Sequence, residues 1–375
     1  MRRVALDRLL PDYIKRFEAY VPSKPDRELM KLYGCSHLHR LNNNENPLGP
    51  PAAAQEALRR FDPPRASLYP NGDSYFLRRK LAQIFDKHPD QFIIGNGANE
   101  VISFVIKAFC ESGDNIVTAD KTFAVYEWVA AFSGFEPRLV PLKNYGFDAQ
   151  GMLDQVDART KILFVCNPNN PTGTFWNEQE LSSFLDKVGS NKIVVLDEAY
   201  FEFVGNSDFP NGISLMEKYP NLVVFRTFSK MYGLAALRIG YLAGDLEIVN
   251  AIRRTCIVYS VNAPAQEAAL AAVGDNDHIS RTRDLVKRGK DYLLGELGRL
   301  GLSSISGEGN FLMVKLPMSD TLVYRKLMSQ GVMVRTMTDF RFPNHIRVTI
   351  SKMDAMAALV EAMERTLDSK SSRTG

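Results

Sequence analysis

Three continuous apolar segments constrain the fold of this chain most strongly. They are KILFVC, KIVVLD and NLVVFR, at residues 161–166, 192–197 and 221–226. Helical sequence separates them, and strands without polar alternation are typical of a parallel sheet covered by helices on both faces. Ligands of such sheets bind at the carboxyl ends of the strands. The residues that follow these three segments are therefore the first candidates for a functional site.

Weaker signals of the same kind continue along the rest of the chain. Helices are expected at residues 74–87, 99–111, 123–133, 246–273, 278–300, 320–330 and 352–367. Short strands are expected at residues 92–94, 115–118, 138–141, 302–317, 332–336 and 345–350. This alternation predicts an α/β protein with an N-terminal arm at residues 1–40, a large domain at residues 41–275 and a smaller α/β domain at residues 276–375. Residues 41–55 are expected to join the small domain in part.

Composition and charge argue against several classes of function. The 375-residue chain has 46 basic and 43 acidic side chains, a formal net charge of +3 and no basic tract, so we expect no nucleic-acid partner. No apolar run approaches the roughly 18 residues of a membrane span, so no membrane association is expected. The first residues, MRRVALDRLLPD, lack the apolar core of a secretory signal, which favours a cytoplasmic protein.

The cysteines and histidines form no pattern typical of a disulfide framework or a metal site. His37 and His39 lie two residues apart, but no further ligand follows at a usable spacing, so we predict no metal. The cysteines contain no CxxC pair, which is consistent with reduced thiols. They are Cys35, Cys110, Cys166 and Cys256.

Polar residues follow each of the three apolar segments. Asn167 opens the loop NPNNPTG, Asp197 ends the second segment three residues before Tyr200, and the third leads into FSK, which ends at Lys230. A lysine beside small hydroxyl residues at a strand end suits covalent amine chemistry. Taken singly, a strand-end aspartate is as often a cap or turn former, and NPNNPTG is compatible with a rigid loop. Their coincidence on consecutive strand ends favours a catalytic site.

A second set of residues is suited to bind an anion. IGNGANE, at residues 94–100, is a glycine-containing turn from a strand into a helix, whose first N–H groups favour negative charge. Thr227, Ser229 and Arg238 supply further donors in the same part of the predicted sheet. Such a turn alone is usually only a turn, so the interpretation depends on the whole set.

Together these motifs resemble the fold-type I pyridoxal-phosphate (PLP) aminotransferases, the aspartate aminotransferase superfamily. The resemblance covers nearly the whole chain. It implies a large PLP-binding domain with a mixed, mostly parallel seven-stranded sheet between helices, plus a smaller α/β domain. It also implies PLP as cofactor, a small-molecule amino donor and a 2-oxo acid as substrates, and a homodimer with shared active sites.

The resemblance also implies roles for individual residues. The family's SK lysine, here Lys230, links covalently to the aldehyde of PLP and moves protons, while the aspartate of DEAY, here Asp197, pairs with the pyridinium nitrogen. Asn167 and the catalytic Tyr200 match the partners of the phenolic oxygen. The remaining matches are the ring-stacking Phe123, the phosphate-binding Ala98, Asn99, Thr227, Ser229 and Arg238, and Tyr69, which reaches the cofactor phosphate of the neighbouring subunit.

Within the superfamily, VPSKP, LNNNENPLGP, YPNGD, GNGANE, VMVR and PNHIRVTI together look like the histidinol-phosphate aminotransferase branch. This implies exchange of an amino group between histidinol phosphate and 2-oxoglutarate or glutamate, in histidine biosynthesis. Arg347 resembles the carboxylate-binding arginine, and Arg335 the contact to the substrate phosphate, with Tyr20 of the N-terminal arm as a second donor. Asn167 is expected beside the substrate. How Arg335 and Arg347 divide the two anions stays open.

Departures from the pattern keep alternatives open. Asn99 stands where an acidic residue is common, Phe123 replaces the more usual tyrosine, and Arg341 adds a charge near the predicted substrate arginines. An aromatic or broad-range aminotransferase, or an enzyme like threonine-phosphate decarboxylase, would use the same Lys230. A non-catalytic cofactor-binding protein would not need the intact catalytic set. Phe123 is also compatible with ordinary core packing.

Overall fold

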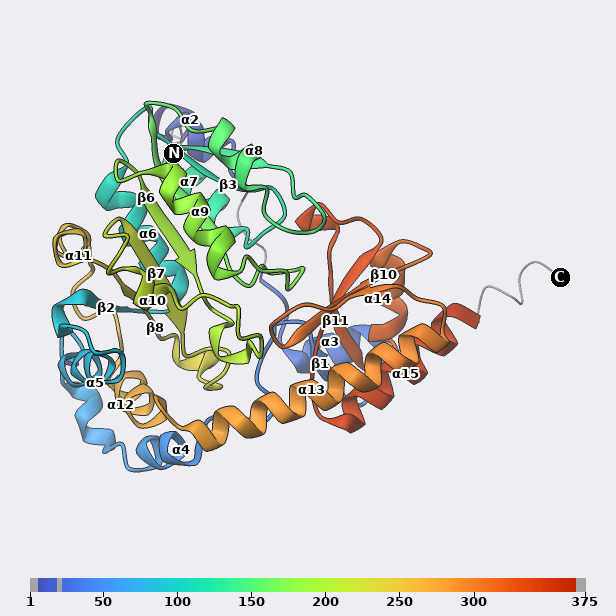
Figure 1. The fold of residues 1–375 in the computed structure, drawn as a ribbon. Coiled ribbons are helices and arrows are strands. Elements are labelled where there is room, and N and C mark those ends of the chain that lie inside the picture. Colours follow the sequence, from blue (N-terminus) through green and yellow to red (C-terminus); the bar gives the residue numbers. More distant parts are fainter. Residues whose placement is uncertain (1–5, 19–21, 369–375) are drawn as a thin grey trace, which may run out of the picture.

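The computed structural model describes residues 6–18 and 22–368, and it contains two β-sheets flanked by helices (Figure 1). The larger sheet has seven strands in the order β2-β8-β7-β6-β5-β3-β4. In chain order these strands are β2 (Phe92–Gly95), β3 (Asn115–Ala119), β4 (Glu136–Val140), β5 (Thr160–Cys166), β6 (Ile193–Asp197), β7 (Leu222–Thr227) and β8 (Gly240–Ala243).

The larger sheet is mixed and mostly parallel, because only β8 runs against its neighbours β2 and β7. Strand β7 is buried along its whole length, and β5 and β6 are buried at all but one residue each. This burial explains why the three sequence segments are continuously apolar. The predicted fold class and the seven-stranded sheet are confirmed.

Helices cover both faces of the larger sheet (Figure 1). The helices of the chain are α1 (Leu6–Leu9), α2 (Asp12–Lys15), α3 (Asp26–Tyr33), α4 (Ala52–Arg59), α5 (Tyr75–Phe85), α6 (Ala98–Phe109), α7 (Val125–Phe132), α8 (Ala149–Asp154), α9 (Glu178–Val188), α10 (Gly212–Leu215), α11 (Leu246–Arg253), α12 (Ala263–Ala272), α13 (Asn276–Arg299), α14 (Asp320–Met328) and α15 (Met353–Asp368). Among the helices of the described residues, none is both long and apolar enough to cross a membrane.

Two expected elements are wrong in their extent. Residues 246–273 are two helices, α11 and α12, because the side chain of Asn262 accepts a hydrogen bond from the N–H of Ala265 and so begins a new helix. The strand expected at residues 302–317 is also divided, into β9 (Ser304–Ile305) and β10 (Phe311–Lys315). Gly309 lies between them with a φ of +105°, a backbone conformation that interrupts regular pairing.

The smaller sheet combines the C-terminal part of the chain with an N-terminal strand. Its order is β1-β11-β12-β10-β9, with β1 at His39–Leu41, β11 at Val332–Thr336 and β12 at His345–Thr349. Strand β1 pairs parallel with β11, and Leu29 of α3 packs on Met328 and Met333. The long helix α13 leads from the larger sheet to the smaller one and packs beside α15 (Figure 1).

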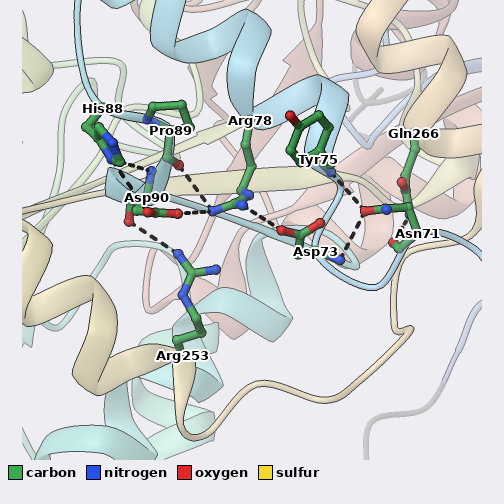
Figure 2. A network of polar contacts seen from close by, with 9 residues as sticks. All are labelled: Asn71, Asp73, Tyr75, Arg78, His88, Pro89, Asp90, Arg253 and Gln266. Carbon is green, nitrogen blue, oxygen red and sulfur yellow. Dashed lines mark hydrogen bonds and ion pairs between the residues drawn. The ribbon is translucent and has the colours of Figure 1, made fainter.

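A polar network holds the surface turn that carries Tyr69 (Figure 2). Arg78 of α5 is buried, and its guanidinium donates to Asp73 at 2.6 Å and to Asp90 at 3.0 Å. These hydrogen bonds join the turn to the 3₁₀ helix at Pro89–Gln91, and the bond from Arg78 lowers the pKa of Asp90. The side chain of Asn71 accepts from the N–H groups of Asp73 and Tyr75, and Gln266 of α12 donates to the Asn71 carbonyl.

We expect Arg78→Met to lower the free energy of unfolding by about 1–3 kcal/mol, because it leaves two carboxylates without their shared partner. The loss stays below that of a fully buried pair, since the side chains of Asp73 and Asp90 are 45% and 51% exposed. The matched control is Arg79→Met on the same helix, where the exposed guanidinium lies over the ring of Tyr75. Thermal unfolding followed by circular dichroism compares the two, and equal midpoints would contradict the role of the network.

Candidate active site

The carboxyl ends of β5, β6 and β7 bring the predicted catalytic residues to one edge of the larger sheet. Cys166 pairs with Asp197, and Asp197 with Phe225, in parallel register. Asn167 directly follows β5, Asp197 ends β6, and Lys230 follows β7 after a short turn. This is the edge at which parallel α/β sheets bind ligands.

Lys230 has the environment of a reactive amine. Its Nζ donates to the carbonyl of Asn43 at 2.7 Å, a neutral acceptor. Burial, together with the positive charge of Arg347, lowers the pKa of Lys230 to about 7. A large fraction of the amine is therefore unprotonated at neutral pH, which is the form that attacks an aldehyde.

Asp197 is a buried carboxylate that lacks a basic partner among the described residues. Its Oδ2 accepts from the hydroxyl of Tyr126 at 2.5 Å, and its Oδ1 from the N–H of Ala199 at 3.0 Å. Burial raises the pKa of Asp197 to about 6, although both hydrogen bonds favour the ionised form. A buried negative charge without a cation is costly, so the site fits a ligand that presents a protonated ring nitrogen here.

Asn167 and Tyr200 are held as hydrogen-bond donors beside this carboxylate. The amide of Asn167 accepts from the N–H of Trp176 and donates to its carbonyl, which fixes the amide plane and leaves one N–H free to donate. The hydroxyl of Tyr200 accepts from the side chain of Asn44 at 2.9 Å. Burial raises the pKa of Tyr200 to about 12, so its hydroxyl stays protonated at neutral pH.

An anion site forms where the N-terminus of α6 meets the turn after β7. A Cβ at Gly97, whose φ is +82°, would lie 2.3 Å from Nη2 of Arg238, so only glycine lets this guanidinium approach the helix start. Arg238 also contacts the hydroxyl of Ser229 at 3.5 Å. The site combines helix N–H groups, hydroxyls and a guanidinium, which suits a phosphate. Its predicted members are Ala98, Asn99, Thr227, Ser229 and Arg238.

Arg347 and Arg335 lie opposite each other on β12 and β11 of the smaller sheet. Arg347 is buried, donating at 2.5 Å to the Asn170 side chain and at 2.7 Å to the Asn42 carbonyl. Burial, reinforced by the charge of Arg335, lowers the pKa of Arg347 to about 10. Within the described residues no carboxylate pairs with either arginine. Two adjacent guanidinium groups suit anionic ligands.

Three further predicted residues are Tyr69, Tyr20 and Phe123. Tyr69 is 84% exposed, and its ring stacks on Tyr259 at 4.8 Å. Tyr20 lies outside the described residues. Phe123 lies edge-on to Tyr126 and lines a small cavity shared with Arg341.

The sequence left the role of Arg341 open. In the structure its guanidinium forms an ion pair with Glu127, a residue of a helix that covers the larger sheet. Its guanidinium makes two hydrogen bonds to the carboxylate of Glu127 on α7, at 2.8 and 3.0 Å, and one to the carbonyl of Asp120. A guanidinium held in this bidentate way has few donors left for a substrate. Arg341 therefore joins the smaller sheet to the larger one.

Three partners of the site went unnoticed in the sequence. Tyr126 bonds Asp197, Asn44 bonds Tyr200, and Asn170 bonds Arg347. The sequence did contain a signal for Tyr126. It lies three residues after Phe123, a spacing that puts both side chains on one face of a helix and so on the same side as the site. The asparagines stand in turn sequences, LNNNEN and NPNNP, whose composition indicates only a backbone conformation.

Comparisons with known proteins agree with this geometry. The family Aminotransferase class I and II matches residues 36–363. The chain belongs to the class I and II aminotransferases. It is 38% identical to histidinol-phosphate aminotransferase of Moorella thermoacetica, over 94% of this chain and 92% of that protein. It is also 38% identical to histidinol-phosphate aminotransferase 2 of Pseudomonas fluorescens, over 94% and 96% of the two chains. The predicted family, its branch and the prediction of an enzyme are confirmed.

Solved structures share the fold of this aminotransferase. Histidinol-phosphate aminotransferase from Sinorhizobium meliloti, in complex with pyridoxal-5'-phosphate, superposes with a TM-score of 0.86 at 23% identity, covering 96% of this chain and 98% of that one. Aspartate aminotransferase from Thermus thermophilus with maleate gives a TM-score of 0.82 at 21% identity, covering 95% and 99%.

Proposed function

We propose that this aminotransferase uses PLP to exchange an amino group between histidinol phosphate and 2-oxoglutarate or glutamate, as a step of histidine biosynthesis. The observation that carries the proposal is that one sheet edge holds both a reactive lysine, Lys230, and the buried carboxylate of Asp197, which has no cationic partner among the described residues. The relatives at 38% identity, both named histidinol-phosphate aminotransferases, support the choice of substrate.

The residues of the site fit each part of PLP. Lys230 would hold its aldehyde carbon, Asp197 its ring nitrogen, and Asn167 with Tyr200 its phenolic oxygen. The anion site at the start of α6 would hold its phosphate, and Phe123 would cover the ring. When bound, PLP supplies a ring that accepts the electrons of the substrate's Cα–H bond.

Lys230 carries the proton transfer in this proposal. Its neutral Nζ would take the proton from the substrate's Cα and hold it, and a base works best in this role when its pKa lies near the working pH. The pKa of about 7 meets that requirement. Tyr200 stays a hydrogen-bond donor throughout, because its own pKa lies far above neutral.

The two arginines would divide the anionic groups of the two substrates. Histidinol phosphate carries a phosphate and no carboxylate, whereas glutamate carries carboxylates. We assign the phosphate to Arg335, which is less buried and lies over the ring of Phe340, with Tyr20 as a second donor. The buried Arg347 would bind the α-carboxylate of glutamate, with its uncharged partners leaving the positive charge available.

A homodimer with shared active sites is part of the proposal. Exposed apolar side chains gather on two segments that meet where Tyr69 stacks on Tyr259. Apolar patches of this kind mark association surfaces, and a second copy of the chain is the occupant we propose. The exposed residues are Leu68, Tyr69, Phe76, Ile257 and Val258.

We place the enzyme in the cytoplasm. Its four cysteines are all free thiols, including the partly exposed Cys35, Cys110 and Cys256. Free thiols are typical of a reducing compartment.

Lys230→Ala tests the central assignment. We expect the variant to fold, to lose the absorbance of the lysine-bound cofactor and to lose at least about 10³-fold in turnover, because both the covalent link and the proton carrier are absent. The matched control is Lys290→Ala, another partly buried lysine whose Nζ donates to a backbone carbonyl. Normal transamination by the Lys230 variant would refute the assignment.

Arg335→Gln tests the substrate. The ratio of kcat/KM for histidinol phosphate to that for unphosphorylated histidinol should fall about 10–100-fold, because a charge-assisted hydrogen bond to the phosphate is lost. Arg341→Gln is the control, and its ratio should change less than about 3-fold, because that guanidinium is already paired with Glu127. The assignment fails if the two variants behave alike, or if phenylalanine or threonine phosphate proves the better substrate.

Mixed dimers test the shared site. Neither Tyr69→Ala nor Lys230→Ala homodimers should be fully active, but a dimer of one subunit of each contains one intact site if Tyr69 acts across the interface. Such dimers, purified with two different tags, should recover up to about half of the wild-type activity. Mixed dimers no more active than the two parents would place Tyr69 in its own subunit's site or outside any site.

A further inference from the structure

Tyr126 is a buried residue whose hydroxyl points at the carboxylate of Asp197. The residue lies in the first turn of α7, has no exposed surface, and donates its hydroxyl to Oδ2 at 2.5 Å. The other oxygen, Oδ1, accepts from the N–H of Ala199 at 3.0 Å. One donor on each oxygen fixes the plane of the carboxylate.

The ring of Tyr126 is held independently of this hydrogen bond. It stacks on Phe164 of β5, with ring centroids 4.7 Å apart and planes 12° from parallel, and the ring of Phe123 meets its edge at 5.6 Å. The packing therefore sets the position of the hydroxyl. The hydroxyl therefore meets Oδ2 of Asp197 from a fixed direction.

The groups around Asp197 leave Tyr126 as its main polar partner. From β5, the thiol of Cys166 donates to the carbonyl of Pro168. From the turn after β6, the charge of Glu198 is matched by Arg226 at 2.8 Å, and Tyr200 bonds to Asn44. Within residues 6–18 and 22–368, Tyr126 is the only side chain that donates a hydrogen bond to Asp197.

We propose that Tyr126 is a positioning residue, which orients the carboxylate of Asp197 for the ring nitrogen of bound PLP. The inference rests on the proposed function, because it assumes that Asp197 meets the cofactor ring. A charge-assisted hydrogen bond from a fixed donor engages one lone pair of Oδ2, and the remaining lone pairs would be left to accept from the ring nitrogen. Tyr126 does not touch the reacting atoms in this role.

The hydroxyl also favours the ionised carboxylate. Burial raises the pKa of Asp197 to about 6, and the hydrogen bond from Tyr126 is the largest effect that opposes this rise. Tyr126 itself remains protonated, because burial and the neighbouring negative charge hold its pKa well above the ordinary value. Removing the hydroxyl therefore raises the pKa of Asp197 further. The protonated fraction then increases at neutral pH, and it increases more as the pH falls.

The test is the affinity of the apoprotein for PLP in Tyr126→Phe, a change that keeps the ring and removes only the hydroxyl. We expect the dissociation constant to rise about 10-fold at neutral pH, the size of one charge-assisted hydrogen bond. The ratio of variant to wild type should grow as the pH is lowered from about 8 to about 6, because the variant protonates Asp197 first. Measuring a ratio at each pH cancels the titration of the cofactor itself.

The matched control is Tyr219→Phe, which removes a hydrogen bond from another buried tyrosine to a carboxylate, that of Asp186, at 2.9 Å. Both variants should lower the thermal midpoint, but only Tyr126→Phe should weaken PLP binding. A double-mutant cycle adds Asp197→Asn, and Tyr126→Phe should then have little further effect on affinity, because the carboxylate it orients is gone.

Three results would each overturn the inference. They are an unchanged dissociation constant in Tyr126→Phe, a ratio that does not depend on pH, and an equal effect of Tyr126→Phe whether or not Asp197→Asn is also present. These outcomes differ from failure of the proposed function. If the wild-type protein itself neither binds PLP nor forms the lysine adduct, the function fails. If the wild type does both and Tyr126→Phe matches it, only the role of Tyr126 is wrong.

Discussion

The parallel pairing of β5, β6 and β7 is the constraint on which the rest of the site depends. Their register sets Cys166 beside Asp197 and Asp197 beside Phe225, so the loops that follow all leave the sheet at one edge. Because these strands are almost wholly buried, a shift of one residue would turn apolar side chains away from their packing. The core therefore holds the relative positions of Asn167, Asp197 and Lys230 more firmly than any contact among them does.

Burial then decides the chemistry of the residues at this edge. It lowers the pKa of Lys230 to about 7 and that of Arg347 to about 10, and it raises the pKa of Asp197 to about 6. The same desolvation thus moves bases and acids toward neutrality, where small changes of environment alter their protonation. A structural ion pair would place such groups in contact and cancel their charges. Here Asp197, Lys230 and Arg347 each form hydrogen bonds to a different uncharged group.

Much of this could be predicted from sequence, because continuous apolar strands identify a parallel sheet and thereby its functional edge. That rule placed Lys230 and Asp197 at this edge, whereas their roles came from the resemblance to the aminotransferases. The rule does not predict the hydrogen-bond partners of the site, which are Tyr126, Asn44 and Asn170. Their partners lie 71, 156 and 177 residues away in the sequence, and only the packed fold brings them together. The break between α11 and α12 was missed because the capping asparagine outweighs the helical pattern around it. The sequence suggested that Arg341 adds a free charge near the substrate arginines. It could not show that Glu127, from a helix on the larger sheet, pairs with that charge.

The turn at residues 42–46 shows how the two sheets share one site. It directly follows β1, the edge strand of the smaller sheet, and the N–H of Asn44 is anchored to the hydroxyl of Thr349 on β12. From there it supplies carbonyls to Arg347 and Lys230, and an amide to Tyr200. All of these partners are neutral. A carboxylate in place of the Asn43 carbonyl would raise the pKa of Lys230 and protonate the amine, and one beside Arg347 would cancel the charge that a substrate anion needs. The carbonyls of Asn42 and Asn43 accept hydrogen bonds from Arg347 and Lys230 without forming an ion pair with either, and that leaves both side chains available to a ligand.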